Sequence, residues 1–133
     1  LTFLENDCDV VTNCGTYLSY PMGIYTQVFR SKDLEWVAMN IDDPAIREHV
    51  SLYFYENTNK YKILNMVAPN SMNYPNWRLQ LDYKEDLKLL RLIYKNLQPK
   101  YGDAFKLEHI CQLLLSKPDL IDINIDCIEK NPR

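Results

Sequence analysis

The stretch Trp77–Leu97, WRLQLDYKEDLKLLRLIYKNL, carries the clearest fold signal in this chain. Apolar and polar residues alternate over Trp77–Leu81, which predicts a β-strand. From residue 84 to residue 97 an apolar stripe recurs at helical spacing, which predicts an amphipathic helix with an acidic first turn. Asp82 stands at the junction of the two. A carboxylate at that point in an α/β protein commonly holds a metal ion or a polar ligand group.

On either side of this stretch, β-prone and helix-prone segments follow one another. The expected strands are Cys8–Thr12, Ile24–Phe29 and Tyr61–Val67, with an edge strand at Asp122–Ile128. The expected helices are the end of one at Leu1–Asn6, then Lys32–Met39 capped by Ser31, a helix from Pro44 to Tyr55 capped by the preceding aspartates, and Leu107–Leu115. Strands that alternate with helices predict an α/β fold, and we expect residues 1–133 to form a single domain.

Composition narrows the classes of function. The net charge is only -3 and 25% of the residues are charged, which argues against a nucleic-acid-binding surface. No apolar run approaches the roughly 20 residues that span a bilayer, and the acidic N-terminus does not look like a signal peptide. The four cysteines form no CxxC pair, so we expect reduced thiols in a cytoplasmic protein, with a disulfide or zinc site as the alternative.

Glycine usage excludes one kind of site. The chain has three glycines, Gly15, Gly23 and Gly102, and none lies in a GxGxxG or GxxxxGK[ST] motif. These residues therefore contain no backbone loop for the phosphates of a nucleotide. Because the chain opens on Leu1 with LTFLENDCD, which resembles the end of a helix, we expect it to be a piece of a longer protein.

Asp82 has two interpretations. It is a candidate magnesium ligand, because magnesium takes carboxylate oxygens from proteins together with phosphates and water. It also fits a capping box, with Asp82 as N-cap and Glu85 at the third helical position. One oxygen of a carboxylate can cap a helix while the other faces a cleft, so the two roles are compatible.

Two further groups of residues are candidates for chemistry. Arg47 and His49 flank an acid in a helical segment, where a titratable imidazole beside a cation serves proton transfer or anion binding. Successive helical residues point about 100° apart, so these three cannot all face one ligand. The competing interpretation is that Arg47 and Glu48 are solvated while His49 meets a neighbouring loop. In the loop YPMGIYTQVF, Tyr25 and Gln27 alternate with apolar residues and are candidates to line a pocket, although a half-exposed strand needs no such role.

Five segments, taken together and in this order, resemble a known family: CDVVTN, YPMGIYTQVF, AIREHVSLYF, YKILNMV and WRLQLDYKEDLKLLRLIYKNL. They resemble the C-terminal half of the spore-coat-polysaccharide-type cytidylyltransferases, relatives of the acylneuraminate and KDO cytidylyltransferases. The tail FKLEHICQLLLSKPDLIDIN resembles the closing segment of the same family. The resemblance implies a Rossmann-like nucleotidyltransferase fold, of which this chain is the C-terminal part.

The resemblance also implies an activity: magnesium-dependent condensation of CTP with a sugar, expected to be acidic, for surface polysaccharide biosynthesis, with release of pyrophosphate. By position, Asp82 matches a metal-binding aspartate that works with a second aspartate from the N-terminal half. Arg47 and His49 match an Arg-Glu-His motif on the sugar side of the cleft, and Arg78 matches an arginine expected to bind substrate. The segment by itself is expected to be inactive.

The chain departs from the family pattern at several positions. The family loop reads proline-x-glycine-x-aspartate-x-glutamate, and here Tyr25 and Gln27 replace the two acids. Ile46 replaces an aspartate before the Arg-Glu-His motif, and Lys84 replaces a proline. Two other classes therefore stay open: a non-catalytic binding or regulatory domain that lost its acids, and a structural half that forms a homodimer through its apolar helices.

Overall fold

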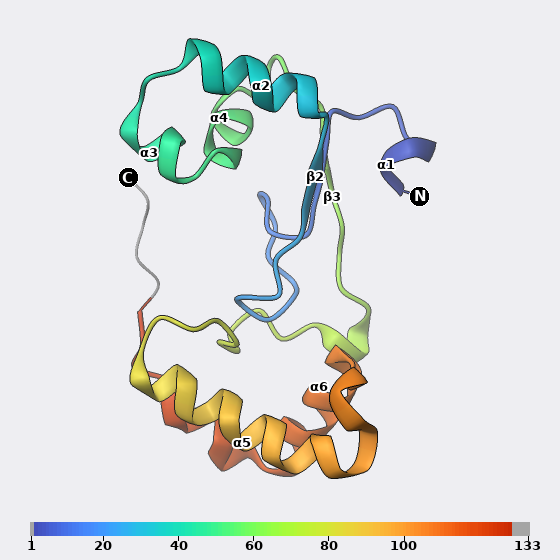
Figure 1. The fold of residues 1–133 in the computed structure, drawn as a ribbon. Helices are drawn as coiled ribbons and strands as arrows, with labels where there is room; N and C mark the ends of the chain where they lie inside the picture. The colour runs from blue at the N-terminus through green and yellow to red at the C-terminus, as the bar shows by residue number, and fades with distance from the viewer. Residues whose placement is uncertain (1, 129–133) are drawn as a thin grey trace. The chain divides into compact units, whose positions relative to one another are not determined.

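The computed structural model describes residues 2–128, which divide into two compact units. Unit 1 comprises residues 2–18 and Tyr25–Val67, and unit 2 comprises Ser19–Ile24 and residues 68–128. Figure 1 shows the helices and strands of both units.

Unit 1 contains a small mixed sheet of three strands in the order β2-β1-β3. The central strand β1 (Val10–Thr12) is antiparallel to β2 (Gln27–Phe29) and parallel to β3 (Ile63–Asn65). All of β1 is buried, as expected for an apolar central strand with neighbours on both sides. All three strands lie inside the predicted segments but are shorter than predicted.

Four helices belong to unit 1: α1 (Thr2–Glu5), α2 (Ser31–Asn40), α3 (Pro44–Glu48) and α4 (Ser51–Glu56). In Figure 1, α2, α3 and α4 gather beside the sheet and enclose one apolar core. The buried residues of this core are Val10, Val37, Ile46, Tyr53 and Phe54. The predicted helix end at residues 1–6 is present as α1, while residue 1 lies outside the described residues.

The predicted helix from Pro44 to Tyr55 is wrong in one respect, because it is two helices. The chain leaves helical geometry at His49, with φ -125° and ψ 75°, and α4 starts two residues later. His49 and Val50 both have low helix propensity, which favours a break at this point. The predicted start is confirmed, since Oδ1 of Asp43 accepts hydrogen bonds from the backbone N–H of residues 45 and 46 at 2.9 and 3.2 Å.

Unit 2 is helical. It contains α5 (Lys84–Tyr101), α6 (Leu107–Ser116) and three 3₁₀ segments, η1 (Asn70–Met72), η2 (Gly102–Ala104) and η3 (Pro118–Asn124). In Figure 1 the red η3 segment runs along α5, and both pack against α6. The buried residues of the shared core are Leu79, Leu89, Ile93, Leu97 and Leu114. None of the helices in residues 2–128 has both the length and the apolar character needed to cross a membrane.

Helix α5 continues one turn beyond the predicted end at Leu97 and contains Pro99. Proline has no backbone N–H, so the helical hydrogen bond to the carbonyl of residue 95 is missing. The helix stops at Gly102, whose φ of 64° lies in the left-handed region that glycine adopts without strain. The predicted edge strand at Asp122–Ile128 is wrong, because η3 and a following turn occupy this region.

The strand predicted at Trp77–Leu81 is also wrong. The segment makes a single parallel bridge, between Met22 and Arg78, through backbone hydrogen bonds from Met22 N to Trp77 O and from Leu79 N to Met22 O. The predicted alternation fails as well, since Arg78 is buried at 6% exposure and Leu81 is 57% exposed. Arg78 is buried because two carboxylates compensate its charge, and periodicity alone does not reveal that compensation.

Candidate functional site

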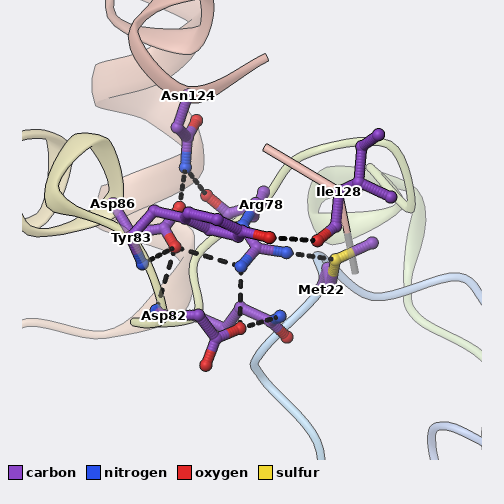
Figure 2. Close-up of polar contacts among 8 residues, drawn as sticks. Met22, Arg78, Asp82, Tyr83, Asp86, Asn124 and Ile128 are labelled. Carbon is purple, nitrogen blue, oxygen red and sulfur yellow. Dashed lines mark hydrogen bonds and ion pairs between the residues drawn. The ribbon is translucent and has the colours of Figure 1, made fainter. Parts of the chain in front are cut away.

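Asp82 lies at the surface of unit 2 and is held there by one of its two carboxylate oxygens. Its Oδ2 accepts hydrogen bonds from Nη2 of Arg78 at 2.8 Å and from Nε2 of Gln80 at 2.6 Å. Among the described residues, Oδ1 accepts no hydrogen bond, and the side chain is 55% exposed. Arg78, Asp82, Asp86 and Asn124 form a polar cluster. Figure 2 shows one oxygen of the Asp82 carboxylate bonded to Arg78 and the other directed away from this cluster. One oriented oxygen is therefore available to a ligand.

Asp86 lies beneath Asp82 and organises the cluster. It is fully buried and accepts five hydrogen bonds. Oδ1 accepts from Nε of Arg78 at 2.9 Å and from Nδ2 of Asn124 at 2.7 Å. Oδ2 accepts from Nη2 of Arg78 and from the backbone N–H of residues 82 and 83, each at 3.0 Å (Figure 2). The arginine thus contacts one carboxylate with two nitrogens, a geometry that fixes its orientation.

The pKa shifts of Asp86 and Arg78 agree with this hydrogen-bond geometry. Burial by itself raises the pKa of Asp86, but the hydrogen bonds from Arg78, Asn124 and two backbone amides outweigh burial and hold that pKa well below its ordinary value. The hydrogen bond to Asp86 in turn raises the pKa of Arg78. Arg78 and Asp86 are therefore both charged near neutral pH, and their charges cancel.

The predicted capping box is out of register by one residue. The N-cap of α5 is Tyr83, not Asp82, and Asp86 occupies the third helical position in place of Glu85. Asp86 reaches back to the backbone N–H of residues 82 and 83, so it fulfils the capping role predicted for its neighbours. This shift frees Asp82 from capping.

Two cavities adjoin the cluster within unit 2. One of about 450 Å³ is lined by Arg78 and Asn124 together with apolar side chains, and one of about 380 Å³ is lined by Tyr83, Glu85 and Asn124. The Arg78 guanidinium carbon also lies 5.3 Å from the centre of the Tyr83 ring, a cation–π distance. Asp82 itself lines neither cavity, so its free oxygen opens to the surface.

Asp82 can supply one ligand of a magnesium site, but the described residues do not form a complete site. Magnesium in phosphoryl-transfer enzymes commonly takes one or two protein carboxylates and completes its shell with phosphates and water. Asp82 presents one such oxygen. Within residues 2–128, no three acidic, histidine or cysteine side chains cluster as a metal site.

Arg47 and His49, predicted together as a catalytic pair, lie in unit 1 at the end of α3. Arg47 is half-exposed, with Nε 3.7 Å from a carboxylate oxygen of the highly exposed Asp42. His49 ends the helix, with Nε2 3.8 Å from the Glu48 carboxylate and half of its side chain exposed. Both side chains remain accessible to a ligand.

Gln27, predicted to line a sugar pocket, contributes to a polar cluster at one end of the sheet in unit 1. Its Nε2 donates to the Tyr55 hydroxyl at 2.9 Å and to Sγ of Cys14 at 3.2 Å. The Tyr55 hydroxyl donates to Oγ1 of Thr12 at 3.0 Å, and burial raises the pKa of Tyr55 to about 12. The Gln27 amide is therefore engaged with protein groups. Tyr25, half-buried, precedes β2 in the same unit.

Of the predicted site residues, the structure joins Arg78 and Asp82 directly. Sequence reasoning missed Asp86, Asn124 and Gln80. A local signal existed for Asp86, an acid in the first turn of a helix and four residues after Asp82. No local signal marks Asn124, which is 38 residues from Asp86 in the chain. All four cysteines are free thiols.

Comparison with known proteins supplies one relative and one structural neighbour. No protein-family model matches the chain. An uncharacterized protein of Methanocaldococcus jannaschii is 30% identical over 132 residues, which covers 98% of this chain and 51% of that protein. A solved cytidylyltransferase from Leptospira borgpetersenii serovar Hardjo-bovis superposes with a TM-score of 0.77 at 25% identity, covering 90% of this chain and 49% of that one.

These comparisons establish the fold. The chain has a mixed α/β arrangement, a small three-stranded sheet with flanking helices, that matches the fold of a cytidylyltransferase. The predicted α/β fold class is therefore confirmed. The chain spans about half the length of both proteins it matches.

Proposed function

We propose that this chain is part of a cytidylyltransferase that couples CTP to a sugar, in the class that serves surface polysaccharide biosynthesis. The observation that carries the proposal is the structural likeness to a solved cytidylyltransferase over 90% of the chain. The oriented, exposed carboxylate of Asp82 supports it, because such a reaction needs an acidic metal ligand. The order of the family-like sequence segments is a third, independent support.

In the proposed reaction, a sugar hydroxyl oxygen attacks the α-phosphorus of CTP. A new oxygen–phosphorus bond forms, and the bond between the α-phosphorus and the oxygen that bridges to the β-phosphorus breaks. Pyrophosphate leaves with that electron pair, and the hydroxyl proton passes to solvent. Reactions of this kind are accelerated chiefly by positioning and by neutralisation of charge on the phosphoryl oxygens. A bound magnesium ion supplies part of that neutralisation. Asp82 would hold it together with a carboxylate outside the described residues.

The roles of the other residues follow from their exposure. Of the two arginines proposed to bind an acidic sugar, Arg78 has Nε and Nη2 bonded to carboxylates, whereas Arg47 keeps an exposed guanidinium. Arg47 is therefore the better candidate for two parallel hydrogen bonds to a sugar carboxylate. His49, exposed beside it in sequence, is proposed to orient the acceptor hydroxyl. Tyr25 and Gln27 are proposed to contact the sugar because of the family resemblance, while the Gln27 amide also bonds to Tyr55 and Cys14.

The test is a pyrophosphate-release assay on the full-length protein with CTP, magnesium and a panel of acidic and neutral sugars. Asp82→Asn is expected to lower turnover at least about a hundredfold while the protein stays folded, because a metal ligand is lost. Asp119→Asn, an exposed acid of the same unit, is the matched control and is expected to behave like the wild type. Equal magnesium dependence in wild type and Asp82→Asn would refute the metal assignment.

A second candidate is a non-catalytic binding domain. It is favoured by the absence of acids at Tyr25 and Gln27 and by the engagement of the Gln27 amide with Tyr55 and Cys14. In this case the full-length protein would release no pyrophosphate with any sugar of the panel. The structural variant of this proposal, a homodimer, requires the full-length protein to sediment as a dimer.

A further inference from the structure

We propose that Arg78 and Gln80 are positioning residues, which hold Asp82 by Oδ2 so that Oδ1 alone faces a divalent cation. The inference rests on the proposed metal role of Asp82 and assigns functions to two residues beside it. Both donors converge on the same oxygen, at 2.8 and 2.6 Å, and neither contacts the other oxygen. A carboxylate held in this way presents one oxygen in a fixed direction, as partners behind metal ligands generally do.

Charge compensation makes this arrangement compatible with cation binding. An arginine beside a metal ligand would normally repel the cation. Here Asp86 contacts Arg78 at 2.9 and 3.0 Å and neutralises it, so the cluster keeps the single negative charge of Asp82. Asp86 is buried and Asp82 is exposed, so the uncompensated charge is the one that faces solvent.

The backbone around Gln80 is held by the segment that ends at Gly23. Gly23 has a φ of 94°, and a Cβ atom at this position would lie 2.5 Å from the backbone nitrogen of Gln80. Only glycine permits this close approach. Backbone hydrogen bonds from Met22 N to Trp77 O and from Leu79 N to Met22 O join the same two segments. The Pro-Met-Gly turn of the sequence therefore has a structural role in fixing the segment that carries both positioning residues.

Gln80 is the residue to vary, because its side chain is only half-buried and, within the described residues, bonds only to Asp82. Gln80→Met keeps the side-chain length and removes the donor. Arg78 is less suitable, since its removal would leave Asp86 buried without a cation. Gln112→Met is the matched control, because Gln112 is exposed on α6 and bonds to no described side chain.

The experiment measures Mn²⁺ binding to the full-length protein by EPR titration without nucleotide, and the magnesium dependence of pyrophosphate release. For Gln80→Met we expect the dissociation constant for Mn²⁺ and the magnesium concentration at half-maximal rate each to rise about tenfold. Turnover at saturating magnesium should stay within about twofold, because the ligand oxygen itself is retained. The control should match the wild type, and circular dichroism should confirm that both variants fold.

Two results overturn the inference, and they are distinguishable. If Asp82→Asn abolishes Mn²⁺ binding while Gln80→Met binds Mn²⁺ like the control, the metal role of Asp82 stands and the positioning role is wrong. If Asp82→Asn binds Mn²⁺ like the wild type, or if the wild type binds none, the metal assignment fails and the positioning role fails with it.

Discussion

Among single residues, Asp86 has the largest influence on the structure of the polar cluster. It is completely buried, yet it is charged, because an arginine, an asparagine and two backbone amides donate to it. Burial of a carboxylate is tolerated only with such compensation. The same residue caps α5 and orients Arg78, so helix geometry and the orientation of Asp82 depend on one carboxylate.

Asp86→Asn should therefore be strongly destabilising. The amide is nearly isosteric, but it leaves Arg78 buried beside only one carboxylate, and it turns an acceptor into a donor near the backbone amides. Breaking a buried pair by removing one partner typically costs about 3–5 kcal/mol. Urea unfolding at pH 7 measures the loss, with Asp119→Asn as the exposed control. A loss below about 1 kcal/mol would mean that this contact contributes no more than a surface salt bridge does.

The destabilisation should also depend on pH. The pKa of Asp86 in the folded protein lies below that of an unfolded aspartate, about 3.9, so the unfolded state takes up the proton first on acidification. The contribution of Asp86 to the free energy of unfolding is thus complete above that value and is lost as the pH falls toward the folded pKa. Thermal unfolding of wild type and Asp86→Asn should show a gap in Tm that narrows below about pH 4. A gap that stays constant from pH 6 to pH 3 would contradict this assignment.

At the scale of elements, helix starts are the best-determined feature of the chain. The Asp43-Pro44 pair predicts a helix start, and α3 begins at Pro44 with both cap hydrogen bonds in place. The pairing works because an aspartate oxygen accepts from free amides and proline fixes a helical φ. The start of α5 at Lys84 agrees with the prediction too, although the capping residue is a different one.

Asp43→Ala should destabilise the protein by about 1 kcal/mol, because two backbone N–H groups of α3 lose their acceptor. Asp43→Asn should recover most of that stability, since asparagine caps nearly as well. Asp42→Ala is the matched control. The Asp42 side chain is 99% exposed and makes only a 3.7 Å contact with Arg47. Its removal is therefore expected to change the stability by only a few tenths of a kcal/mol. Chemical denaturation of the three variants checks the order, and equal losses in Asp42→Ala and Asp43→Ala would rule out the cap as the cause.

At the scale of the whole molecule, the proposed activity needs groups that these residues lack. The chain contains no glycine-rich phosphate loop, and its described residues contain no complete metal site. It also spans about half the length of the proteins it matches. We propose that this chain supplies one metal ligand and the residues that contact the sugar.

The 133-residue chain by itself is therefore expected to bind CTP with magnesium too weakly for calorimetry to detect at micromolar protein concentrations. The full-length protein should bind CTP under the same conditions. Circular dichroism of the chain, compared with the helix content described here, is the control that it is folded. Tight binding of CTP by the folded chain would show that the nucleotide site lies within these residues.

How far prediction from sequence succeeds depends on the range of the interactions. The α/β class, the strands β1 to β3 and the starts of α3 and α5 follow from local periodicity and capping, and they are confirmed. The strand at Trp77–Leu81 is wrong, because its alternating pattern assigns Arg78 to the solvent side. The edge strand at Asp122–Ile128 is wrong because Asn124 turns inward to Arg78 and Asp86, contacts that a local pattern does not encode.

The sequence by itself determined the fold class, the strands β1 to β3 and the starts of α3 and α5, since each depends on residues near one another in the chain. Only the tertiary structure decided which oxygen of Asp82 is free and why Arg78 is buried. Those properties depend on hydrogen bonds among Arg78, Asp86 and Asn124, and the last of these lies 46 residues from the first. A buried charge is stable only when distant partners converge on it, and that convergence is a property of the folded chain.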